Sequence, residues 1–257
     1  MGLNIIDFHT HLDDRWFEKP LISEAEFLAG MDRCGVDVAC IFTLMGFYGD
    51  APGANERLAR HARRHPRRFI PFVTVDPKLG RPAVEELERR LSDPLFRGVK
   101  FHHWLQAVAS SMVRETMVEL LRCAARHRAP LIFHDGTPPY STTYQIAELA
   151  RWVPEASIVL GHAGLGDYVY EAGQLARSLP NLYLCFCGPK AGELQYLVEM
   201  AGADRILFGS DFGFSDWKMI DERLDEVREA GLDEATQAKI LGGNAVRLLG
   251  LHERALA

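Results

Sequence analysis

The sequence predicts an α/β fold, a (β/α)8 TIM barrel formed by a single domain over residues 1–257. Short apolar segments recur along the chain, each followed by an amphipathic helical segment, and eight such pairs fit this length. Near-continuous apolar strands are typical of a parallel sheet that helices cover. No GxGxxG turn follows the first strand, which disfavours an open, doubly wound sheet.

The eight strands are expected at 5–11, 36–43, 69–75, 98–102, 131–134, 158–162, 182–187 and 206–211. A loop over residues 12–22 precedes the first helix, which should begin at Ser23, because Ser23 and Glu26 form a capping box, and end at Gly35. Pro82 begins the third helix. Apolar spacing places the other helices at about 53–65, 112–128, 142–151, 167–179, 190–202, 216–230 and 233–250.

The composition excludes several classes of protein. With 47% hydrophobic and 25% charged residues, the chain can bury a sizeable core and is not disordered. The net charge is −6 and the basic residues are scattered, which argues against nucleic acid or a membrane surface as partner. No apolar window reaches the roughly 20 residues that span a bilayer, and no signal sequence is present. We therefore expect a soluble, cytoplasmic protein.

The five cysteines are odd in number, form no CxxC motif and lie mostly inside apolar segments. Buried free thiols in a reducing compartment explain them best. Cys185 and Cys187 would share one face of a strand, so a soft-metal or redox site at this pair is the alternative.

The first strand ends in a pair of histidines. Alternation along the strand predicts that Asp7, His9 and His11 share one face. Phe8 would then lie on the other face. Two imidazoles that leave a strand end side by side can bind one metal ion. Two surface histidines are the alternative interpretation, because the chain contains 10 histidines.

Polar residues also end several later strands. In a (β/α)8 barrel the C-terminal ends of the strands build the active site. The candidate residues, in chain order, are His9, His11, Lys100, His102, His134, His162 and Asp211. Each one alone has an ordinary explanation, such as a surface histidine or a helix cap at Asp211. Their joint position at strand ends indicates one functional site.

This ordered set resembles the amidohydrolase superfamily, and specifically its Amidohydrolase 2 (amidohydrolase-related) branch. The similar segments are DFHTH (7–11), GVKFH (98–102), HDGTP (134–138), GHAG (161–164), FGSD (208–211) and GNAVRLLGL (243–251). They extend over nearly the whole chain. The resemblance implies a metal-dependent enzyme with a small-molecule substrate that can form a homodimer or a larger homo-oligomer.

The resemblance also implies roles for individual residues. His9, His11 and His134 would bind one divalent ion, most often zinc. Asp211 would be a fourth ligand or would lie within hydrogen-bond distance of the metal-bound water. Asp211 could then accept a proton, and His162 could polarise a substrate carbonyl as a second catalytic residue.

Further residues are expected to contact the substrate, namely Lys100, His102, Trp104, Asp135 and Thr137. We interpret Lys100 as an ammonium that binds a substrate carboxylate, although binuclear relatives carry a carboxylated lysine at this place. His103 stands where proline is more usual, which leaves the roles of His102 and His103 open. Aromatic loop residues would either contact a planar substrate group or pack as a lid, and they are Trp16, Phe47, Tyr48, Trp104, Tyr140, Tyr144, Phe212 and Trp217.

The expected function is a metal-dependent hydrolase. Its substrate would be a small carbonyl compound (an ester, lactone, amide or C–C bond) with a carboxylate or aromatic group. A non-oxidative decarboxylase, that is a lyase, on the same metal site is the alternative, because the branch contains both activities and some metal-free lactonase-like members. A catalytically silent barrel or binding protein should lack a ligand, and none is missing. A phosphate-binding barrel, with loops at Gly188 and Gly213, would not require the three histidines.

Overall fold

The protein, seen in a computed structural model that describes residues 5–13 and 15–251, contains an eight-stranded parallel barrel. The strands follow the order β1-β4-β5-β6-β7-β8-β9-β10. They are β1 (Ile6–His11), β4 (Val38–Phe42), β5 (Phe69–Val73), β6 (Gly98–Phe101), β7 (Leu131–Phe133), β8 (Ile158–Leu160), β9 (Leu182–Phe186) and β10 (Ile206–Phe208). This arrangement confirms the predicted (β/α)8 barrel.

The barrel closes between its first and last strands. The backbone N–H of Asp211 donates to the carbonyl of His9 at 2.9 Å, and the N–H of His11 donates to the carbonyl of Phe212 at 2.7 Å. Asp211 comes shortly after β10. The hydrogen bonds that close the barrel therefore also place Asp211 beside the two histidines of β1.

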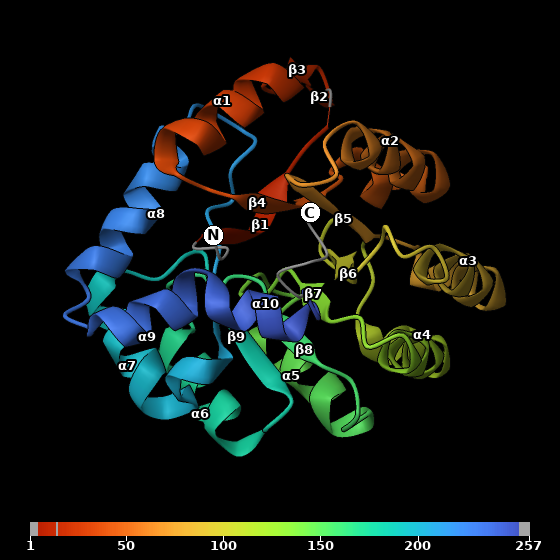
Figure 1. Ribbon diagram of the computed structural model, residues 1–257. Coiled ribbons are helices and arrows are strands. Elements are labelled where there is room, and N and C mark those ends of the chain that lie inside the picture. Colours follow the sequence, from red (N-terminus) through yellow and green to blue (C-terminus); the bar gives the residue numbers. More distant parts are fainter. Residues whose placement is uncertain (1–4, 14, 252–257) are drawn as a thin grey trace.

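Helices form a ring around the strands (Figure 1). The predicted capping box of Ser23 and Glu26 is present, and Gly35 ends the first helix at φ +72°. The helices are α1 (Glu24–Cys34), α2 (Ala51–Arg64), α3 (Arg81–Leu91), α4 (Arg114–Arg126), α5 (Thr143–Trp152), α6 (Val169–Ser178), α7 (Ala191–Ala201) and α8 (Lys218–Glu229). Among the described residues, no helix combines the length and the apolar character that crossing a membrane requires.

The last predicted helix, 233–250, is divided in the structure. It consists of α9 (Glu234–Ala238), a π-helical turn (Lys239–Gly243) and α10 (Asn244–Leu248). In Figure 1 this segment runs across the near end of the barrel. Ala245, Leu249 and Leu251 join the apolar cluster that contains Ile6 and Leu207. The C-terminal segment therefore seals the end of the barrel at which the strands begin.

Two short strands interrupt the loop that was predicted over residues 12–22. Two short antiparallel strands, β2 (Arg15–Trp16) and β3 (Lys19–Pro20), pair within it. Strands of two residues are too short to produce an alternating apolar pattern, which explains why the sequence did not indicate them.

The first strand departs from simple alternation. Its register with β4 shifts between Asp7 and Thr10. Phe8 packs on Phe72 of β5, while His9 contacts Lys100 of β6, so both side chains point into the barrel. The prediction that Phe8 and His9 lie on opposite faces is therefore wrong, because an irregularity in a strand interrupts the period of two.

All five cysteines are free thiols. Cys40, Cys123, Cys185 and Cys187 are buried, and Cys34 is half-buried. The prediction of buried free thiols is thus confirmed for four of the five.

Candidate active site

A cavity of about 270 Å³ opens at the C-terminal ends of the strands. Histidines and one carboxylate form its polar part, while aromatic and leucine side chains form the rest. The lining residues are His11, Trp16, Leu44, His102, Trp104, Leu105, His134, Thr137, His162, Leu165, Asp211 and Phe214. The end of the barrel predicted to carry the site is the end that carries this cavity.

Two histidines and one carboxylate converge at the cavity floor. Nε2 of His9 lies 3.5 Å and Nε2 of His11 lies 3.3 Å from Oδ1 of Asp211. One donor atom from each residue lies within 4.8 Å of the other two. The group offers two imidazole nitrogens and one carboxylate oxygen to a single cation.

Neighbouring atoms fix the orientation of His9. Its Nδ1 lies 2.8 Å from the carbonyl of Gly161 and donates to it, which assigns the lone pair to Nε2. Burial, and then the positive charge of Lys100, lower the pKa of His9 well below its usual value. His9 is thus a neutral imidazole, and its Nε2 accepts a hydrogen bond from Lys100 at 2.8 Å. The same nitrogen is the one that a metal ion would use.

Lys100 lies beneath the cavity and not in its wall. It is buried, and its Nζ lies 2.8 Å from Nε2 of His9. Burial lowers the pKa of Lys100 to about 8, although the nearby carboxylate of Asp211 opposes this shift. The structure therefore places the Lys100 ammonium against His9, where we had expected it to face a substrate carboxylate.

Asp211 has an unusual backbone conformation, with φ at +61°. Such a conformation is costly for a residue other than glycine, and it is common at functional sites. Burial alone would raise the pKa of Asp211, but hydrogen bonding to His11 and the charge of His162 hold the pKa well below its usual value. Asp211 is therefore a carboxylate at neutral pH.

His162 reaches the cavity from the turn after β8. Its Nδ1 donates to the carbonyl of Cys187 at 3.0 Å. Burial disfavours the protonated form, but the Cys187 sulfur and the Asp211 carboxylate favour it, and the pKa of His162 is raised to about 9. Since burial also raises the pKa of the Cys187 thiol well above its usual value, Asp211 provides the negative charge near neutral pH. His162 is thus a candidate proton donor.

Asp135 holds the turn that carries His162. Its Oδ1 accepts the backbone N–H of His162 at 2.7 Å, and its Oδ2 accepts the N–H of Gly164 at 2.8 Å. The side chain is fully buried and does not line the cavity. We had expected Asp135 to contact the substrate, but in the structure it positions His162.

The other two histidines expected near the substrate are separated. His102 lines the cavity, and its ring stacks on that of His134 with 3.9 Å between centroids. His103 is buried in the wall, where it contacts Phe133 and Ser110. His102 is therefore the one of the pair that can meet a ligand in the cavity.

His134 lines the same cavity, but its ring nitrogens do not join the donor atoms of the other proposed metal ligands. Its Nε2 lies 2.7 Å from the hydroxyl of Thr137. Its donor atoms are not in the described group of His9, His11 and Asp211. Three of the four predicted ligands are thus brought together directly.

The model of the family described as Amidohydrolase matches residues 6–251, almost the whole chain. This chain belongs to the amidohydrolase family. The resemblance found in the strand-end motifs is thereby confirmed.

Solved structures share the fold of this amidohydrolase. The 5-carboxyvanillate decarboxylase from Sphingomonas paucimobilis has a TM-score of 0.78 and 16% identity, covering 98% of this chain and 100% of that one. A dihydroxybenzoic acid decarboxylase from a Polaromonas species, with bound manganese and the inhibitor 2-nitroresorcinol, has a TM-score of 0.78 and 20% identity, covering 99% of each chain. The 4-oxalomesaconate hydratase from Rhodopseudomonas palustris has a TM-score of 0.70 and 18% identity, covering 96% of this chain and 95% of that one.

One curated protein matches part of the amidohydrolase sequence. The bifunctional glutamine synthetase adenylyltransferase/adenylyl-removing enzyme from Streptomyces avermitilis is 33% identical over 109 residues, which cover 38% of this chain and 11% of that protein. The match thus spans about a tenth of that protein's length.

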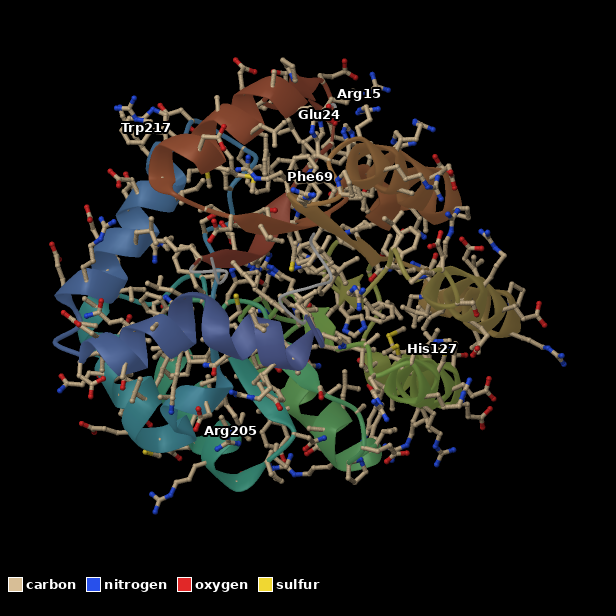
Figure 2. The ribbon with its side chains drawn as sticks, viewed as in Figure 1. Arg15, Glu24, Phe69, His127, Arg205 and Trp217 are labelled. Atoms are coloured by element: carbon tan, nitrogen blue, oxygen red, sulfur yellow. The ribbon has the colours of Figure 1, made fainter. Side chains whose placement is uncertain are left out.

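The walls of the amidohydrolase cavity were predicted less well than its floor. Of the aromatic candidates, Trp16 and Trp104 line the cavity. Trp217 instead lies on the outside of the barrel beside α1, where the guanidinium of Arg33 is 3.9 Å from its ring centroid (Figure 2). Four lining residues were not predicted from the sequence, namely Leu44, Leu105, Leu165 and Phe214. Their positions in loops after strands were the available signal, but no sequence pattern showed that their side chains point into the cavity.

Proposed function

We propose that this amidohydrolase is a metal-dependent, non-oxidative decarboxylase of a small aromatic carboxylic acid. Among the expectations from the sequence, this was the alternative to hydrolysis. The observation that carries the proposal is the cavity itself, which has the size of one aromatic ring and apolar walls. Side chains of the kind that bind metal ions form its floor. Two of the similar structures named above are aromatic-acid decarboxylases by their own descriptions.

The apolar walls favour loss of CO2 on physical grounds. Trp16, Trp104 and Phe214 offer aromatic surfaces to a planar ring. An ionised carboxylate is costly in apolar surroundings, whereas the CO2 that forms from it is neutral. Apolar surroundings therefore destabilise the reactant more than the product, provided that the floor holds the acid in place.

The floor fits a divalent cation. His9, His11 and Asp211 would hold it, and His134 is the proposed fourth ligand. Imidazole nitrogen and carboxylate oxygen are donor types that divalent cations such as Mn²⁺ and Zn²⁺ bind, and the three donor atoms lie within 4.8 Å of one another. The ion, manganese or the zinc expected from the sequence, would supply positive charge that holds the substrate carboxylate.

His162 would donate the proton that replaces the carboxylate. The proton is added to the ring carbon that bears the carboxylate, the bond to the carboxylate then breaks, and its electron pair restores the aromatic ring as CO2 leaves. Asp211 stabilises the protonated form of His162 beforehand, and Asp135 keeps its ring in place through the backbone. His162 then recovers a proton from solvent.

The test is to identify the reaction products formed by protein loaded with Mn²⁺ and, separately, by protein loaded with Zn²⁺. We expect monohydroxy- and dihydroxybenzoates to release CO2 and to acquire one deuterium at the former carboxylate position in D2O. His162→Gln should lose this activity. The matched control is His127→Gln, because His127 lies on the outer surface at the end of α4 (Figure 2). Hydrolysis of esters or lactones without any release of CO2 would instead support the hydrolase interpretation.

A further inference from the structure

Cys187 brings a sulfur atom to the floor of the candidate active site. It directly follows β9 and is buried, and its Sγ lies within 4.8 Å of a ring nitrogen of both His9 and His162. Gly209 permits this approach, because a Cβ at that position would lie 2.7 Å from the Cβ of His9 and 3.3 Å from that of Cys187. The structure thus contains a second compact donor group beside the first.

The two donor groups differ in chemical character. His9, His11 and Asp211 offer nitrogen and oxygen, while His9, His162 and Cys187 offer nitrogen and sulfur. Carboxylate oxygen suits Mn²⁺, whereas thiolate sulfur favours softer cations. Cations of different softness would therefore prefer different groups on the same floor.

His9 belongs to both groups, but it can serve only one cation at a time. Its Nδ1 is committed to the carbonyl of Gly161, so Nε2 carries the single available lone pair. Binding in one group therefore removes a ligand from the other.

We propose that His9, His162 and Cys187 form a site for thiophilic divalent cations such as Cd²⁺, and that its occupation excludes Mn²⁺ from the group of His9, His11 and Asp211. When the cation binds, the thiol of Cys187 and the protonated imidazole of His162 each lose one proton to solvent, and no oxidation state changes. The site itself does not depend on the proposed decarboxylation. A cation bound to His162 should also inhibit turnover, because His162 could then no longer donate a proton. Only this expected inhibition rests on the proposed function.

The first test is optical and needs no turnover. Metal-free protein titrated with Cd²⁺ should develop the near-ultraviolet charge-transfer absorption of a sulfur–cadmium bond, reaching its end point at one ion per chain. Cys187→Ala should abolish the absorption. Cys40→Ala is the matched control, since Cys40 is also a buried thiol on a strand but belongs to no donor group among the described residues, and it should keep the absorption. An unchanged absorption in folded Cys187→Ala protein would overturn the proposal.

The second test separates the two groups by exchanging metals. Cd²⁺ added to the Mn²⁺ protein should release one Mn²⁺ per Cd²⁺ bound, as followed by the electron paramagnetic resonance of free Mn²⁺. His11→Ala should weaken Mn²⁺ binding by more than about 100-fold, beyond the loss typical of an outer partner, and still give the cadmium absorption. Binding of Cd²⁺ without release of Mn²⁺ would overturn the proposal. These readouts stay informative even if the protein is not a decarboxylase.

Discussion

The two ends of the barrel differ in the kind of side chain that they bury. Where the strands begin, Leu249 and Leu251 of the C-terminal segment pack against Ile6 and Leu207. Where the strands end, the buried side chains include imidazoles, an ammonium and carboxylates. Burying apolar groups stabilises the fold, whereas burying polar groups without full pairing costs stability. The comparison indicates that the end where the strands begin stabilises the fold, and that the end where the strands finish carries the functional side chains.

The size of a hollow does not distinguish the two ends. A hollow of about 670 Å³, lined among others by Arg97, His127 and Arg247, exceeds the 270 Å³ of the candidate active site. None of the strand-end histidines or Asp211 lines it. A donor group also lies near this hollow, formed by Glu88, Cys123 and His127, but Glu88 and His127 are only half-buried and pair with each other. The two buried histidines that converge on Asp211, and not volume, therefore identify the functional end.

The largest expected effect is at the end where the strands finish. His162→Gln removes the proposed proton donor and should lower kcat by about 10²–10⁴-fold, the usual contribution of a general acid. The midpoint of urea unfolding should change little, because glutamine can still hydrogen bond to the carbonyl of Cys187. Steady-state kinetics beside urea titrations check this, and a variant that keeps full turnover would contradict the assigned role.

The next effect is expected at the opposite end of the barrel, where a substitution should lower stability and leave turnover unchanged. Leu207→Ala deletes a fully buried side chain of the apolar cluster and should lower the free energy of unfolding by about 2–5 kcal/mol. Turnover per folded molecule should persist. If this variant lost activity while keeping its stability, the division of labour between the two ends would be wrong.

A smaller, pH-dependent effect should arise at Asp7. Burial raises the pKa of Asp7 to about 7 despite its hydrogen bonds from Ser210. Unfolded chains release this proton near pH 4, so the folded state binds more protons between about pH 4 and 7 and loses stability as the pH rises through that range. Asp7→Asn should flatten this slope in urea titrations of metal-free protein, and a slope equal to that of the wild type would count against it.

The smallest effect is expected far from both ends. Ser23 caps α1 at the surface of the outer ring, next to Glu24 (Figure 2). Ser23→Ala should cost about 1 kcal/mol of unfolding free energy, because the N–H of Glu26 loses its side-chain partner. Activity should not change. Thermal unfolding checks the cost, and a loss above that of Leu207→Ala would reverse the predicted order.

Much of the fold could be predicted because its signals are local. Apolar strands, the cap at Ser23 and the stop at Gly35 each act through neighbours in sequence. The positions of His9, His11 and Asp211 followed from the rule that strand ends meet at one face of a barrel.

The remaining features depend on contacts between distant parts of the chain. Lys100 meets His9 across 91 positions, and Asp135 accepts the N–H of His162 across 27 positions. No local pattern reports such pairs, so both residues were expected to face the substrate. The irregularity of β1 was missed for the same reason, since it exists only relative to the register of β4.

The most direct test of the account is the metal content of the protein. Wild-type protein equilibrated with Mn²⁺ and passed through a desalting column should retain about one ion per chain by plasma mass spectrometry, since the floor offers one donor group for such a cation. His9→Ala should retain almost none. His65→Gln should match the wild type, because His65 ends α2 and belongs to no donor group among the described residues. Equal metal content in His9→Ala and the wild type would contradict the claim that the strand ends form a metal centre.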